Sequence, residues 1–156
     1  MYKVLFICRH NSTRSQIAEA YLKEMGGEHF LVESAGFDPG PINPDVIRVL
    51  QEEGIDISHK TSQKVFDLFK QGKIFDFVIT VCEQEEGQCP VFPGVTHRLH
   101  LPFPDPAQVT GDEEERLAAI RSIRDQIKAN ISEFACWVPS GEKRSLSELW
   151  EQRSSA

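Results

Sequence analysis

The stretch Val4-Leu5-Phe6-Ile7-Cys8-Arg9-His10-Asn11-Ser12-Thr13-Arg14-Ser15 decides how this chain of 156 residues folds. Its first four residues form an apolar run typical of a buried strand, and the residues that follow Ser15 have helical periodicity. Where a chain turns from a strand into a helix, unpaired backbone N–H groups and the helix dipole attract an anion. The stretch therefore predicts an oxyanion loop, residues 9–15, with Cys8 at its mouth.

Four side chains of this stretch have expected roles. A positive field of this kind lowers the pKa of a thiol, so we expect Cys8 to be a thiolate nucleophile at neutral pH. Arg14 offers a planar fork of donors that fits two oxygens of a tetrahedral oxyanion. Asn11 tolerates left-handed backbone angles, and the Ser15 hydroxyl can donate to the sulfur. A lone cysteine is more often a small buried hydrophobe, but these neighbours at these offsets favour catalysis.

Short apolar runs alternate with helical segments along the rest of the chain. We expect strands at 3–7, 30–34, 75–81 and 96–101, and helices at 15–26, 44–53, 64–71 and 112–135. This pattern predicts an α/β fold, a single doubly wound domain with a four-stranded parallel sheet flanked by helices. Ligands of such sheets bind beyond the carboxyl ends of the strands, where Cys8, Cys82 and Asp105 all fall.

Two segments resemble a known family. The pattern Cys8-x-x-Asn11-x-x-Arg14-Ser15 resembles the phosphate-binding loop of low-molecular-weight protein tyrosine phosphatases and of the thioredoxin-coupled arsenate reductases that share their fold. The segment Phe103-Pro104-Asp105-Pro106-Ala107 is similar to the loop that supplies the aspartate of those enzymes. The resemblance implies a catalytic domain at residues 1–136, followed by a C-terminal extension at 137–156 in which a short packed helix is expected.

The other three cysteines are Cys82, Cys89 and Cys136. Six residues separate Cys82 from Cys89, about two helical turns, so a disulfide between them would require the segment to bend or unwind. The alternatives are one buried and one exposed thiol, or two zinc ligands. For zinc, this spacing is too wide and a second pair of cysteines is lacking. We expect Cys136 to pack in the core.

The resemblance to the arsenate reductases implies a thiol relay. In this relay Cys8 attacks arsenate while Asp105 protonates the leaving group. Cys82 then attacks Cys8 and releases arsenite, and Cys89 attacks Cys82 to leave a Cys82–Cys89 disulfide. Thioredoxin is the implied reductant of that disulfide.

Two other functions remain open. The first is a low-molecular-weight protein tyrosine phosphatase that hydrolyses phosphomonoesters through a phosphocysteine at Cys8. Against it, Thr13 stands where those phosphatases usually carry a second cysteine, and residues 107–108 stand where they carry aromatic side chains. The second is a non-catalytic redox sensor that uses the same thiols.

Composition and charge argue against other classes of function. A net charge of −7 disfavours binding to nucleic acid or to an anionic membrane. We find no signal peptide and no long apolar run, and we expect a cytoplasmic monomer. The resemblance also suggests a potassium ion held through Asn11, Glu19 and Ser34, but Gln63 replaces its acidic ligand. We therefore predict neither a metal nor a cofactor.

Overall fold

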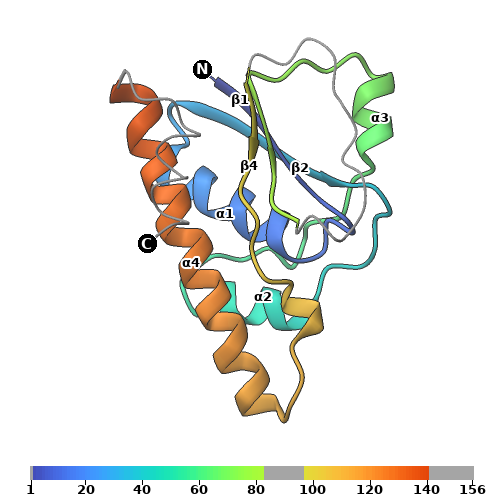
Figure 1. Cartoon of the computed structure of the whole chain (residues 1–156), viewed down its shortest axis with the longest axis vertical. Coiled ribbons are helices and arrows are strands. Elements are labelled where there is room, and N and C mark those ends of the chain that lie inside the picture. The colour runs from blue at the N-terminus through green and yellow to red at the C-terminus, as the bar shows by residue number, and fades with distance from the viewer. Residues whose placement is uncertain (1, 83–96, 141–156) are drawn as a thin grey trace.

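The computed structural model describes residues 2–82 and 97–140. Within them, four strands form one parallel sheet in the order β2-β1-β3-β4 (Figure 1). Their bounds are β1 Tyr2–Cys8, β2 Phe30–Gly36, β3 Phe77–Thr80 and β4 His97–His100. The helices are α1 Arg14–Gly26, α2 Pro44–Gln51, α3 Val65–Lys70 and α4 Glu113–Ser140, with a 3-10 helix, η2, at Pro106–Gln108. The expected α/β fold with a four-stranded parallel sheet is confirmed.

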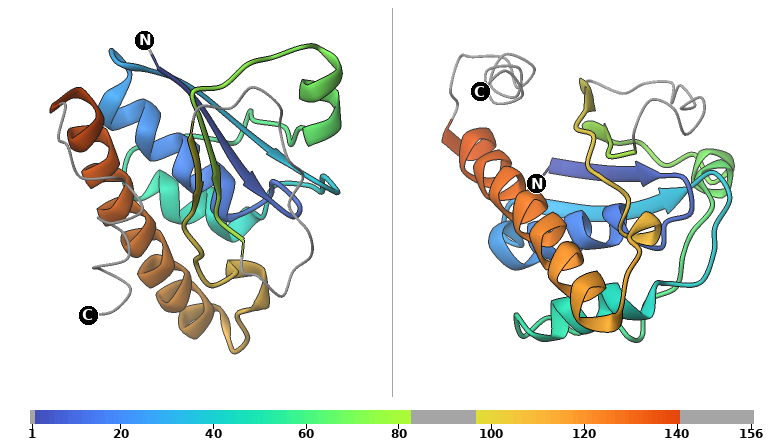
Figure 2. Two further views of the ribbon diagram at one scale, coloured as in Figure 1. Left: turned by 45° about the horizontal axis from the view of Figure 1, so that its top comes forward. Right: turned by 60° about the horizontal axis from the view of Figure 1, so that its bottom comes forward.

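The central strand β1 is buried on both faces of the sheet. Val4 and Phe6 pack into the larger hydrophobic cluster with residues of α1, α2 and α4. Leu5 and Ile7 pack into a smaller cluster with residues of α3 on the opposite face. Figure 2 shows α1, α2 and α4 on one side of the sheet and α3 on the other. Burial of both faces explains why the first strand is an unbroken apolar run and not an alternating one.

Helix α2 is capped at its start and joined to α4 at its end. The Asn43 side chain caps α2 by accepting from the backbone N–H of Asp45 at 2.8 Å, and Pro44 occupies its first turn. After the last turn of α2, Arg121 of α4 donates to both carboxylate oxygens of Glu52, at 2.9 Å and 2.7 Å. The hydrogen bond from Arg121 lowers the pKa of Glu52 from 4.5 to about 2.

Helix α4 continues beyond the end expected at residue 135 and reaches Ser140. Its core positions Ile127, Ile131 and Phe134 are fully buried. Cys136 lies two residues after Phe134 and is exposed, because a step of two residues turns a side chain away from the packed face of a helix. The expectation that Cys136 packs in the core is therefore wrong. Residues 141–156, most of the expected extension, lie outside the described residues.

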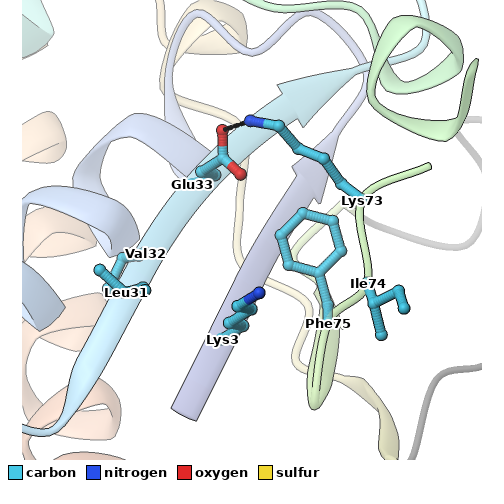
Figure 3. Close-up of a pocket in the computed structure, with 7 residues that line it drawn as sticks. All are labelled: Lys3, Leu31, Val32, Glu33, Lys73, Ile74 and Phe75. Atoms are coloured by element: carbon cyan, nitrogen blue, oxygen red, sulfur yellow. Dashed lines mark hydrogen bonds and ion pairs between the residues drawn. The ribbon is translucent and has the colours of Figure 1, made fainter. Parts of the chain in front are cut away.

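A groove of about 310 Å³ opens where β1 and β2 begin, at the edge of the sheet opposite Cys8 (Figure 3). An ion pair of 2.8 Å between Glu33 and Lys73 spans it. The groove is lined by Lys3, Leu31, Val32, Glu33, Lys73, Ile74 and Phe75. These side chains include no thiol and no histidine, so they do not supply the chemistry that the sequence predicts. Neither α4 nor any other described helix combines the length and the hydrophobicity that a membrane crossing requires.

Candidate active site

Strand β1 ends at Cys8 and helix α1 begins at Arg14, so the oxyanion loop connects a strand to a helix as expected. The carbonyl oxygens of Arg9, His10 and Ser12 accept hydrogen bonds of 2.9 to 3.0 Å from the segment between β2 and α2. The donors are the backbone N–H groups of Asp38, Gly40 and Asn43. The C=O and N–H of a trans peptide point in opposite directions. Because these three loop carbonyls point toward the segment between β2 and α2, the N–H groups of the same peptides point to the other side of the loop. An anion can bind there.

Gly36, the last residue of β2, lets the loop backbone approach the sheet. A Cβ atom at this position would lie 2.7 Å from the backbone nitrogen of Asn11 and 2.8 Å from the carbonyl oxygen of Arg9. Such distances are too short, so the loop requires glycine here. No sequence motif marks Gly36; its one signal is a glycine within a strand, which often indicates a close backbone approach.

Asn11 is fully buried and has the expected left-handed backbone, with φ of 52°. Its Oδ1 atom accepts from the backbone N–H of Gln63 at 2.9 Å, which identifies the oxygen end of the amide. Its Nδ2 atom donates to Ser15 Oγ at 2.8 Å and to Ser34 Oγ at 2.9 Å. Asn11 thus ties the loop to α1, to β2 and to the segment before α3.

Cys8 is 1% exposed, and its sulfur contacts two residues of the oxyanion loop. It is 2.8 Å from Ser15 Oγ and accepts from the Asn11 backbone N–H at 3.2 Å. Because Ser15 Oγ already accepts a hydrogen bond from Asn11 Nδ2, its own hydrogen can point at the sulfur. Two donors on one sulfur stabilise a negative charge there.

Arg14 and Asp105 meet across the mouth of the loop. Arg14 Nη1 donates to the Phe103 carbonyl oxygen at 3.2 Å, and Nη2 lies 3.6 Å from Asp105 Oδ2. Asp105 Oδ1 accepts from the Ala107 backbone N–H at 2.9 Å and from the Thr13 hydroxyl at 3.4 Å. The Asp105 side chain therefore caps η2 and faces the loop.

Cys82 follows β3 at the same edge of the sheet. Ile7 pairs with Thr80 in the sheet, and the Val81 backbone N–H donates to the Ile7 carbonyl oxygen at 2.9 Å. This register places Cys82 one residue beyond the position opposite Cys8, and both side chains are buried. Cys89 lies outside the described residues.

Glu19, on α1, is 2% exposed and belongs to the same hydrogen-bonded cluster. Its Oε1 atom accepts from the Ser34 hydroxyl at 3.1 Å. Its Oε2 atom lies 2.6 Å from Lys60 Nζ and 3.3 Å from Lys23 Nζ. The sequence points to Glu19 only through the suggested potassium site, and no sequence motif connects Lys60, in the loop before α3, to Cys8.

In this chain the first strand of a parallel sheet ends at a cysteine, and an arginine closes the loop that follows. This arrangement is typical of a class of proteins that bind tetrahedral oxyanions. The chain belongs to the low molecular weight phosphotyrosine protein phosphatase family, whose model matches residues 3–147. The family that the sequence motifs suggest is confirmed.

Named relatives in this family include arsenate reductases. The arsenate reductase of Bacillus subtilis is 38% identical over 133 residues, which are 85% of this chain and 94% of that protein. A solved arsenate reductase in its oxidized state matches with a TM-score of 0.72 and 28% identity, over 87% of this chain and 98% of that one. A thioredoxin-dependent arsenate reductase of Corynebacterium glutamicum matches with a TM-score of 0.69 and 31% identity, over 91% of this chain and 64% of that one.

Proposed function

We propose that this chain is an arsenate reductase that converts arsenate to arsenite through a thiol relay and is then reduced by thioredoxin. The names of its relatives support this activity. The observation that carries the proposal is that Cys8 and Cys82 follow neighbouring strands and belong to one buried cluster. Hydrolysis of a phosphate ester needs one nucleophilic cysteine, whereas reduction needs a second thiol that can reach the first.

Burial in one cluster supports contact between the two thiols. Cys8 ends β1, and Cys82 comes two residues after β3 ends at Thr80. Both belong to the larger hydrophobic cluster on one face of the sheet. Because the two side chains share that cluster, we expect a Cys8–Cys82 disulfide to form as an intermediate.

In the first step the Cys8 thiolate attacks arsenic and forms an S–As bond. One arsenate oxygen leaves as water after it receives a proton from Asp105. Arg14 and the N–H groups of the loop hold the remaining oxygens and stabilise their charge. Arsenic remains in the +5 state throughout this step.

The redox step follows when the Cys82 thiolate attacks the Cys8 sulfur. An S–S bond forms, and the S–As bond breaks with its electron pair on arsenic, so that As(V) becomes arsenite, As(III), and two thiols become one disulfide. Cys89 then attacks Cys82, which releases the Cys8 thiolate and moves the disulfide to Cys82–Cys89. The dithiol of thioredoxin reduces this last bond and is itself oxidised.

The proposal also covers the domain bounds, the oligomeric state and the cellular compartment of the enzyme. We assign the catalytic unit to residues 1–136 and regard 137–156 as an extension. The enzyme would act as a monomer in the cytoplasm, where thiols are kept reduced between turnovers.

A steady-state assay with arsenate, thioredoxin, thioredoxin reductase and NADPH tests the proposal. We expect multiple turnovers, lost in Cys82→Ser and in Cys89→Ser, while slow hydrolysis of an aryl phosphate by Cys8 survives in both variants. Cys136→Ser is the matched control, because this exposed thiol has no part in the relay, and it should turn over normally. Unchanged arsenate turnover in both relay variants would overturn the proposal.

Phosphomonoester hydrolysis is the second candidate, favoured by the family model and by the position of Asp105 beside the oxyanion loop. It needs Cys8, Arg14 and Asp105 but neither Cys82 nor Cys89. A much higher kcat/KM for aryl phosphates than for arsenate would identify this activity. A protein that turns over neither substrate would be a redox sensor.

A further inference from the structure

The relay does not use Glu19, a carboxylate that the fold buries beside the oxyanion loop. Burial of a charged group is costly unless an opposite charge and hydrogen bonds compensate it. Two lysines approach the same oxygen, Oε2. Lys60 Nζ lies 2.6 Å away with 23% of its side chain exposed, whereas Lys23 Nζ lies 3.3 Å away with 49% exposed. Lys60 is therefore the closer and less solvated counter-charge.

A continuous set of hydrogen bonds connects Glu19 to the Cys8 sulfur, and each donor can be assigned. The Ser34 hydroxyl donates to Glu19, so its oxygen is available to accept from Asn11 Nδ2. The second Nδ2 hydrogen goes to Ser15 Oγ, which leaves the Ser15 hydroxyl hydrogen to point at the sulfur. The hydrogen bonds of the set therefore have a fixed direction. The group at each end, the Glu19 carboxylate and the Cys8 sulfur, accepts a hydrogen bond.

The segment that carries Lys60 also fixes the Asn11 amide from its other end. The Gln63 backbone N–H donates to Asn11 Oδ1, and the Gln63 side chain donates to the Ser34 carbonyl oxygen at 3.1 Å. Residues 60–63 therefore contact both the carboxylate at the start of the hydrogen-bonded set and the amide at its centre.

We propose that Lys60 is a positioning residue for Cys8, because its ammonium group holds the Glu19 carboxylate where it accepts from Ser34 and so fixes the direction in which Ser15 donates to the nucleophile. Without Lys60, the buried Glu19 carboxylate loses its closest counter-charge, so it either repels a thiolate at Cys8 or turns away from Ser34 toward solvent. In the second case the Ser34 hydroxyl must find another acceptor, and the alignment of Asn11 and Ser15 is lost. Both outcomes leave the Cys8 thiolate less stabilised.

The direct test measures the rate at which iodoacetamide alkylates Cys8 at neutral pH. Mass spectrometry of the peptide that contains Cys8 gives this rate. Protection by inorganic phosphate identifies the reaction as occurring in the oxyanion loop. We expect alkylation about tenfold slower in Lys60→Met, as for the loss of one charge-assisted interaction, and within about twofold of the wild type in Lys23→Met. Lys23→Met is the matched control because Lys23 reaches the same carboxylate oxygen from the solvent.

Rescue separates an electrostatic role from a purely structural one. Lys60→Arg keeps the charge and should alkylate within about threefold of the wild type. The double variant Glu19→Gln/Lys60→Met removes both charges and leaves an amide oxygen to accept from Ser34, so it should recover most of the rate even if Lys60→Met alone fails to fold. Wild-type alkylation in folded Lys60→Met, or no recovery in both rescue variants, would overturn the proposal.

The consequence for turnover rests on the proposed function. In the thioredoxin-coupled assay Lys60→Met should lower kcat about tenfold and change KM less than about twofold, since Arg14 and the loop N–H groups that bind the oxyanion are retained. If the wild type fails to reduce arsenate, the proposed function fails while the alkylation result still decides the role of Lys60. A raised KM with unchanged kcat would contradict a role in positioning the nucleophile.

Discussion

Arg14 and Asp105 form a pair across the mouth of the oxyanion loop, with Arg14 Nη2 3.6 Å from Asp105 Oδ2. Both side chains are largely buried, at 2% and 11% exposure. Under the proposed function, we expect a bound oxyanion to compete with Asp105 for the guanidinium donors. Substrate binding would then release the carboxyl group from Arg14 beside the leaving oxygen and so couple binding to proton transfer.

Replacement of Asp105 by asparagine tests this coupling. Asp105→Asn keeps the shape of the side chain and an oxygen that can cap η2, but it cannot deliver a proton. We expect kcat for arsenate reduction and for aryl phosphate hydrolysis to fall about a hundredfold or more. Inhibition by inorganic phosphate should be as strong as in the wild type or stronger, because Arg14 loses a competing carboxylate. A wild-type kcat in steady-state assays would exclude Asp105 as the proton donor.

Arg14→Lys tests whether the loop needs the planar fork or only a positive charge. Lysine cannot bind two oxygens in one plane and cannot reproduce the hydrogen bond to the Phe103 carbonyl oxygen with the same geometry. We expect kcat/KM to fall roughly 10² to 10³-fold, as on loss of an oxyanion donor. The control is Arg9→Lys, at an exposed position of the same loop, for which we expect kcat/KM within about threefold of the wild type. A wild-type kcat/KM in Arg14→Lys would show that a positive charge alone is enough at this position.

Gly36→Ala tests the close approach between β2 and the oxyanion loop. The added Cβ would meet backbone atoms at 2.7 Å and 2.8 Å, and backbone yields less readily than a flexible side chain. We expect the free energy of unfolding in urea to fall by about 1 to 3 kcal/mol, together with slower turnover. Gly40→Ala is the control, because a Cβ there meets its nearest neighbour at an ordinary 3.9 Å. Similar stabilities for the two variants would show that the loop adapts without cost.

The ion pairs between α2 and α4 predict a pH dependence of stability. The pKa of Glu52 is lowered in the folded protein from 4.5 to about 2 by Arg121. A carboxyl group with a lowered folded-state pKa stabilises the protein above its unfolded pKa, and this contribution is lost as the pH falls through the folded value. Glu52→Gln should therefore lower Tm at pH 7, and the difference from the wild type should shrink between pH 4.5 and about 2.

The matched control for this pH experiment is Glu24→Gln, at an exposed position on α1. Its Tm should follow that of the wild type across the same range. A Glu52→Gln variant that is as stable as the wild type at pH 7 would show that the pair with Arg121 adds nothing to the docking of α2.

Much of the site could be predicted because its signals are local. The run from Val4 to Ile7 indicates a buried strand, and the offsets from Cys8 to Ser15 indicate a strand-to-helix loop wherever the rest of the chain goes. The segment around Asp105 was identified by its motif, and the parallel sheet then brings it to the same edge. The prediction for Cys136 failed because burial of a helical residue depends on which face packs, and hydrophobic neighbours in sequence do not specify that face.

The sequence by itself determined the α/β fold, the oxyanion loop and the set of residues that chemistry could use. Local spacing sets backbone conformation and residue chemistry, and both are properties of short segments. Only the tertiary structure decided that Gly36 must lack a side chain, that Asp105 faces Arg14, and that Lys60 neutralises Glu19 behind the nucleophile. These relationships join segments that are distant in the chain, and they depend on the relative positions of strands and loops that only the packed core fixes.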